Sequence, residues 1–266
     1  MENPLEGIVS MAPTVFQDRY AAAAAVVEVC HRLSAGGYVA ATDGNVSARL
    51  SSGNILTTRT AVNKGAVTPR DLVEISPEGK PLPGQGNPST ETGMHLYIYR
   101  ERPECGAVVH AHPLFATGFA TARMPLEGCL FPEVIVGLGA IPLAEYATPS
   151  TPEVAASLAP YVKSAEAILL ANHGVVTFGA DPMDAYYKME KVEHAAHITF
   201  IARMLGGEHR LTPEELEKLR RVSVQSYGKD FSNKIACAIG EPDDEMNEAE
   251  IRRYVEQKLA SLGIHP

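Results

Sequence analysis

The spacing of apolar and polar positions predicts helices and strands that follow one another along the chain. Helical spacing extends over 14–34, over 181–204 and from 212 onward, and TPEVAASLAPYV predicts another helix. Apolar runs bounded by turn residues predict strands on either side of 51–53, at 71–76, at CGAVVHAH (105–112) and on either side of 172–174. Several strands follow each other directly, which predicts an α/β fold with a mixed or antiparallel sheet.

The organisation along the chain indicates one domain. No repeat, low-complexity linker or change in composition divides residues 1–266. We therefore predict a single domain over 1–266, with an N-terminal extension at about 1–14 and a C-terminal tail at about 229–266 that contains a final helix, 246–262.

Two histidines stand at the end of the apolar run 105–112. In a strand, His110 and His112 point to the same face, where two neutral imidazoles would form half of a metal site. A pair of core or surface histidines is the other interpretation. His173 lies in a turn between two predicted strands, where a rigid scaffold presents functional groups, and it would supply a third ligand.

Other histidines are interpreted as structural. His194 and His197 lie three residues apart on the helix predicted over 181–204, which is the spacing of a ligand pair. Their neighbours favour a solvated or interface face instead. His95 follows Glu91 by one helical turn and is taken as structural.

The segment 88–91 predicts the start of a helix, with Glu91 in its first turn. A glutamate there is most simply a capping residue. However, Ser89 and Thr90 offer hydroxyls and free backbone N–H groups, which together favour an anion. An anion site beside a metal site would suit a phosphorylated substrate.

Charge and composition narrow the classes of partner. The formal charge of −9 argues against nucleic acid or an anionic membrane surface as the main partner, but not against a small anionic substrate. The four cysteines form no C-x-x-C pair, and the N-terminus has no basic segment before an apolar core. These features indicate reduced thiols in a cytoplasmic protein.

Four motifs together resemble the class II aldolase/adducin family: GNVSARL (44–50), PSTE (88–91), AVVHAH (107–112) and LLANHGVVTFG (169–179). The resemblance extends over roughly 15–228. It implies a three-layer αβα sandwich with a mainly antiparallel central sheet, and a homotetramer with active sites at subunit interfaces. It also implies a Zn²⁺ site in which His110, His112, His173 and Glu91 are ligands, with Glu91 also the catalytic acid/base.

The resemblance further implies a phosphate site. Asn45, Ser89 and Thr90 match residues that hold the substrate phosphate, and Arg59 and Thr60 replace the Thr-Gly that usually ends a phosphate loop. An arginine there would bind phosphate or carboxylate in a bidentate manner. The change also leaves open an anion other than the usual sugar phosphate.

The chain departs from the family at the aldolase's catalytic tyrosine. That tyrosine, which a neighbouring subunit supplies, should fall near 129–131, where this chain has Cys-Leu-Phe. Glu133 is nominated as the replacement acid/base, and Tyr227 matches a second interface tyrosine.

The function implied is a zinc-dependent aldolase that cleaves a ketose 1-phosphate to dihydroxyacetone phosphate and an aldehyde. Glu91 favours aldol chemistry, because the epimerase branch has an aspartate there. Three alternatives stay open: a pentulose-phosphate 4-epimerase, a metal-dependent decarboxylase or lyase that acts on a carboxylate, and a non-catalytic adducin-like binding protein.

Overall fold

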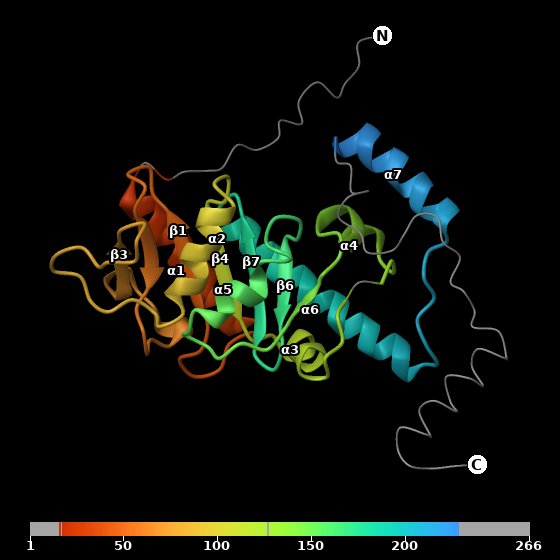
Figure 1. Ribbon diagram of the computed structural model, residues 1–266, viewed down its shortest axis with the longest axis horizontal. Helices are drawn as coiled ribbons and strands as arrows, with labels where there is room; N and C mark the ends of the chain where they lie inside the picture. Colours follow the sequence, from red (N-terminus) through yellow and green to blue (C-terminus); the bar gives the residue numbers. More distant parts are fainter. Residues whose placement is uncertain (1–15, 17, 127, 229–266) are drawn as a thin grey trace, which may run out of the picture.

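A computed structural model describes residue 16 and residues 18–126 and 128–228 (Figure 1). The elements are, in order, α1 (Arg19–Ala35), β1 (Asn45–Arg49), β2 (Ile55–Thr58), η1 (Lys64–Ala66), η2 (Pro69–Asp71), β3 (Leu72–Ile75), α2 (Thr92–Glu101), β4 (Ala107–Ala111), α3 (Leu114–Thr121), α4 (Pro132–Gly137), β5 (Leu143–Ala144), α5 (Glu153–Leu158), β6 (Ala167–Leu170), β7 (Gly174–Gly179), α6 (Pro182–Met204) and α7 (Pro213–Tyr227).

The strands form one sheet with the order β3-β2-β1-β4-β7-β6-β5. All neighbouring pairs are antiparallel except β5 and β6, which are parallel. The expected mainly antiparallel sheet is therefore confirmed. Short connections such as the turn between β6 and β7 permit this arrangement, since antiparallel neighbours need no crossover helix.

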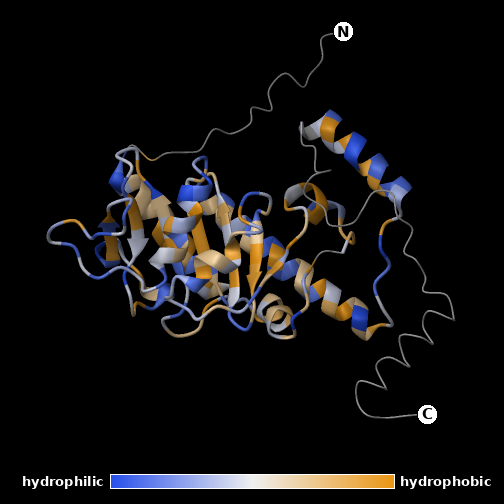
Figure 2. Cartoon of the chain, viewed as in Figure 1, coloured by the Kyte–Doolittle hydropathy of each residue, from blue (hydrophilic) through white to orange (hydrophobic). Residues whose placement is uncertain are grey.

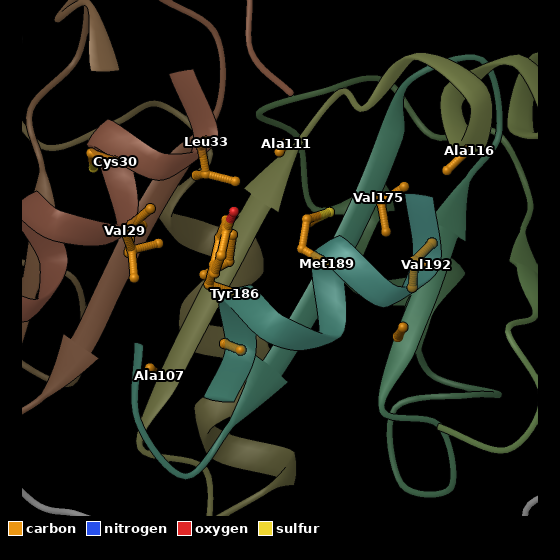
Figure 3. Packing of buried hydrophobic residues seen from close by; sticks show 14 of the residues in the cluster. Val29, Cys30, Leu33, Ala107, Ala111, Ala116, Val175, Tyr186, Met189 and Val192 are labelled. Atoms are coloured by element: carbon orange, nitrogen blue, oxygen red, sulfur yellow. The ribbon is translucent and has the colours of Figure 1, made fainter. Parts of the chain in front are cut away.

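Helices cover both faces of the sheet, and each face has its own apolar core. Along β4, Ala107 and Ala111 pack with α1 and α6 (Figure 3). Val108 packs on the opposite side of the sheet with residues of α2 and α5. Most apolar residues lie in the strands and in the helix faces turned toward them, while the loops are mainly polar (Figure 2). This alternation confirms the three-layer αβα class.

The topology gathers three chain segments at one end of the sheet. Because β1 and β7 both run antiparallel to β4, the starts of β1 and β7 lie beside the end of β4. Asn45 pairs with His110, and Ala111 pairs with Val175. The turn that contains His173 leads directly into β7, so it reaches the same end.

Several boundaries differ from those predicted. α2 begins at Thr92, and Glu91 is its N-cap residue rather than a member of its first turn. The short elements α4, of six residues, and β5, of two, were not predicted, because so few residues show no period. The N-terminal extension and the final helix 246–262 lie outside the described residues.

Two further expectations concern the cysteines and membranes. Cys30 and Cys105 are buried free thiols, but Cys129 is disulfide-bonded, so the expectation of reduced thiols throughout is wrong. Within the described residues, no helix has the length and apolar character needed to cross a membrane.

Candidate metal centre and active site

Three histidines that are distant in sequence meet at the end of β4. The ring centroids of His110, His112 and His173 lie 4.7–5.1 Å apart, and one nitrogen from each lies within 4.8 Å of the others. Nε2 of His112 and Nε2 of His110 are 3.1 Å apart. Such convergence of imidazole nitrogens is the arrangement that a transition metal requires.

Glu91 brings a carboxylate to the same point. Its Oε2 lies 3.4 Å from Nε2 of His110, and its Oε1 lies 3.2 Å from Nε2 of His173. The side-chain amide of Asn45 donates to Oε2 at 2.8 Å. The carboxylate makes no capping hydrogen bond to α2, so the interpretation of Glu91 as a simple capping residue is wrong.

The orientation of His110 follows from its backbone contact. Its Nδ1 lies 2.9 Å from the carbonyl oxygen of Val175. A carbonyl only accepts, so Nδ1 must carry the proton and Nε2 presents its lone pair to the cluster. Backbone carbonyls commonly orient metal-binding histidines in this way.

The position of His112 depends on tight backbone packing. Its N–H donates to the carbonyl of Tyr38 at 2.8 Å, and its Nδ1 lies 3.6 Å from the carboxylate of Asp43. A Cβ at Gly174 would come within 2.5 Å of both the carbonyl oxygen of Ala111 and Cδ2 of His112. Only glycine at 174 therefore permits this approach of the turn to the ring.

The protonation states suit a cation. Burial lowers the pKa of His110 to about 3, although Glu91 opposes the change, and burial together with His173 lowers the pKa of His112. Burial opposes ionisation of Glu91, but His110, His173 and Asn45 outweigh it and hold the pKa of this carboxyl below its usual range. At neutral pH His110 and His112 are therefore neutral imidazoles, and Glu91 is an anionic carboxylate.

This donor set fits a metal ion. A divalent transition metal binds neutral imidazole and ionised carboxylate and leaves a coordination position for substrate when three or four side chains bind it. The same donors accept nickel, cobalt or manganese, so they do not select Zn²⁺ by themselves.

The residues expected to hold an anion lie beside this cluster. A cavity of about 230 Å³ is lined by Thr90 and Glu91 before α2 and by Ser150 and Thr151 before α5. The hydroxyl of Ser89 accepts the N–H of Glu91 at 3.3 Å. Asn45 is buried against Glu91, and its Oδ1 has no partner among the described residues.

Arg59 and Thr60 lie at the edge of the site. The backbone of Arg59 pairs with Pro88, and the N–H of Thr60 donates to the carbonyl of Asn87 at 3.3 Å. Both residues therefore adjoin the segment that leads to Glu91. The guanidinium of Arg59 is half exposed and lies 3.3 Å from Asp71.

The structure does not bring Glu133 to the histidines of the same chain. Glu133 is exposed on α4 and lines a separate cavity of about 800 Å³ between α4 and α6. Tyr227 is the last residue of α7, and its side chain lies outside the described part of the structure.

A buried polar network behind Glu91 was not predicted. His95 is fully buried, its Nδ1 lies 2.7 Å from Oγ of Ser47, and that oxygen lies 2.8 Å from the hydroxyl of Tyr99. Ser47 follows Asn45 by two residues on β1, and His95 follows Glu91 by one turn on α2. This matched spacing is the signal from which the network could have been inferred.

Comparison with known proteins agrees with this geometry. Residues 24–200 match the family model described as Class II Aldolase and Adducin N-terminal domain, and the chain belongs to this family. The 3-oxo-tetronate 4-phosphate decarboxylase of Escherichia coli O6:H1 is 35% identical over 194 residues, which are 69% of this chain and 88% of that protein. The L-fuculose phosphate aldolase of Methanococcus maripaludis C5 is 33% identical over 180 residues, 68% of this chain and 96% of the relative.

Solved structures show the same fold. The crystal structure of YgbL from Escherichia coli superimposes with a TM-score of 0.70 at 31% identity, covering 76% of this chain and 99% of that one. An L-fuculose 1-phosphate aldolase superimposes with a TM-score of 0.69 at 29% identity, covering 75% and 94%. The chain thus spans nearly the whole of these relatives.

Proposed function

We propose that this protein is a metal-dependent lyase that acts on a small phosphorylated substrate with a carbonyl group. It breaks the bond between the α and β carbons relative to that carbonyl and releases dihydroxyacetone phosphate. The observation that supports this most strongly is the convergence of Glu91 with His110, His112 and His173. An adducin-like binding role would not need three converging imidazoles beside a carboxylate.

The residues of the site would have three roles: metal binding, proton transfer and phosphate binding. His110, His112, His173 and Glu91 would hold the metal, and a bound metal ion would act as a Lewis acid that stabilises the negative charge left when the bond breaks. Glu91 is ionised at neutral pH and adjoins the cavity, so it would move the proton at the carbon of the enediolate. Asn45, Ser89 and Thr90 would bind the phosphate, and Arg59 with Thr60 would complete the anion site at its edge.

Two leaving groups are compatible with this chemistry. In aldol cleavage of a ketose 1-phosphate, an aldehyde leaves, and a base must remove the proton of its hydroxyl. Glu133 or Tyr227 from a neighbouring subunit would serve as that base. We propose Zn²⁺-dependent aldol cleavage of this kind as the first candidate, in line with the aldolase relatives.

Decarboxylation is the second candidate, and a specific observation favours it. The positions 129–131, where the aldolase tyrosine should fall, hold a disulfide-bonded cysteine, a leucine and a phenylalanine. Loss of CO₂ from a 3-oxo acid needs no base of this kind, because the carboxylate carries no proton at neutral pH. The relative at 35% identity is named for such a reaction. Decarboxylation of 3-oxo-tetronate 4-phosphate also gives dihydroxyacetone phosphate.

We also propose that the protein works as a cytoplasmic homotetramer. At the end of α6, Met204 and Leu205 are 73% and 83% exposed, which favours burial against a second copy. Light scattering after size-exclusion chromatography should give four chains, and a monomer would contradict the assembly.

Metal analysis combined with a substrate panel tests the proposed function. The metal-loaded protein is incubated with ketose 1-phosphates, pentulose phosphates and 3-oxo acid phosphates, and dihydroxyacetone phosphate is measured with a coupled reductase. Release of an aldehyde would identify the aldolase, and release of CO₂ the decarboxylase. A protein that binds metal and only interconverts pentulose phosphates would be an epimerase, and one that binds no metal would contradict the proposal.

A further inference from the structure

Glu193 is a buried carboxylate on α6 that holds the start of α3. Its residue is 9% exposed, and its two oxygens accept the backbone N–H groups of Phe115 at 2.9 Å and Ala116 at 2.8 Å. The N-cap residue of α3 is Pro113, which makes no side-chain cap. Glu193 therefore supplies, from a distant part of the sequence, the acceptors that the first turn of α3 lacks.

A second contact from α6 reaches the same turn. The ring of His197, one helical turn after Glu193, stacks on Phe115 with centroids 3.8 Å apart and planes 12° apart. This contact explains His197 as a packing residue. Together, the carboxylate and the stacked ring fix the position of the first residues of α3 relative to α6.

The turn that α6 holds is the one that presents His112. Only Pro113 separates His112 from α3, and the N–H of His112 is bound by the carbonyl of Tyr38. Tyr38 and Glu193 both line the cavity of about 800 Å³ between α4 and α6. The backbone around His112 is thus held at two points: Tyr38 binds the N–H of His112 itself, and Glu193 binds the N–H groups at the start of α3.

The use of a charge here has a physical reason. Burying a carboxylate is unfavourable unless strong donors compensate it, and these donors are two backbone N–H groups at the positive end of α3. Charge-assisted hydrogen bonds are shorter and more directional than the apolar contacts that would suffice for packing α3 on α6. The carboxylate therefore limits the movement of the turn in a way that an apolar side chain would not.

We infer that Glu193 is a positioning residue for the metal centre. It fixes the turn that carries His112 and thereby the imidazole of His112, without contacting the metal or the substrate. This inference rests on the proposed metal site. It assigns a function to a residue of α6 that does not line the cavity beside Glu91.

The test compares metal affinity with stability in E193Q and E193D. E190Q is the matched control, because Glu190 is exposed one turn earlier on α6 and, among the described residues, accepts a hydrogen bond from the hydroxyl of Tyr186 and not from the start of α3. Co²⁺ affinity is measured by competition with a chelator, the ligand field by the visible absorption of bound Co²⁺, and folding by thermal unfolding of the metal-free proteins. Loss of a group that orients a ligand weakens metal binding by about 10–100-fold.

We expect E193Q to bind Co²⁺ at least about tenfold more weakly and with an altered spectrum, while E190Q behaves as the wild type. In a His112→Asn background, E193Q should add little, because the ligand that it positions is already gone. E193D keeps the charge on a shorter side chain, so its Co²⁺ affinity should lie between those of the wild type and E193Q. If E193Q does not fold, weaker Co²⁺ binding by E193D than by the wild type serves as the test.

Two results would overturn the inference in distinguishable ways. Lowered thermal stability with wild-type Co²⁺ affinity and spectrum would show that Glu193 only stabilises α3. A wild-type protein that binds no Co²⁺ would instead remove the proposed metal site, and this inference with it.

Discussion

Protonation of His95 should account for a large part of the acid sensitivity of this fold. The imidazole is fully buried, and burial lowers its pKa from 6.5 to about 4, although Glu91 opposes the change. In the unfolded chain the same histidine takes up a proton near pH 6.5. Between these two values the unfolded state binds more protons than the folded state, so stability is present above pH 6.5 and is lost as the pH falls toward 4.

The size of the effect follows from the two pKa values. A folded pKa of about 4 against 6.5 is a difference of about 2.5, which corresponds to about 3.5 kcal/mol at ~1.4 kcal/mol per pH unit. By pH 4.5 about 2.6 kcal/mol of this should already be lost. This is a substantial share of the stability of a typical domain, which is roughly 5–15 kcal/mol.

Urea unfolding of wild type and His95→Asn at pH 7 and pH 4.5 measures this contribution. A chelator in both buffers keeps metal binding from adding its own pH dependence. The wild type should lose about 2–3 kcal/mol more than the variant over this interval, since the other titrating groups, including His110, are common to both. An exposed histidine variant, His209→Asn, should keep the wild-type dependence.

Parallel loss of stability in wild type and His95→Asn would refute this reasoning. It would mean that His95 is protonated in the folded state at pH 4.5, or that water reaches it there. If His95→Asn is less stable than the wild type at pH 7 but equally stable at pH 4.5, the result agrees with the loss of the His95 contribution over this interval.

Three other variants test the site. Glu91→Gln should lower kcat by about 10²–10⁴-fold with the fold intact, and turnover like the wild type would exclude its role in proton transfer. Gly174→Ala should weaken Co²⁺ binding and destabilise the fold by about 1–3 kcal/mol, because the new methyl group would lie 2.5 Å from the carbonyl oxygen of Ala111 and from the ring of His112. An unchanged Co²⁺ affinity would contradict this expectation. Arg59→Ala should change stability by less than about 1 kcal/mol, since its pair with Asp71 is half exposed, but should raise KM for the anionic substrate; an unchanged KM would remove Arg59 from the anion site.

The sequence by itself determined the fold class and most of the elements. Apolar periodicity and turn residues are local signals, so they located the strands on either side of 51–53 and 172–174 and the long helix α6. Consecutive strands joined by short turns can pair only antiparallel, which gave the character of the sheet. The spacing of His110 and His112 and the turn position of His173 marked three residues that the structure brings together.

Other features were decided only by the tertiary structure. From its local pattern, Glu91 was most simply a capping residue, and only the resemblance to the family implied that it is a metal ligand. Its carboxylate turns from α2 toward Asn45 and the histidines because β1 and β4 lie against the start of that helix. Glu193 carried no local signal at all, since the N–H groups that it binds lie 77 and 78 residues away in the sequence. Helical and strand periods report which face of an element is buried, whereas the partner of a buried polar group is set by the packing of elements distant in sequence.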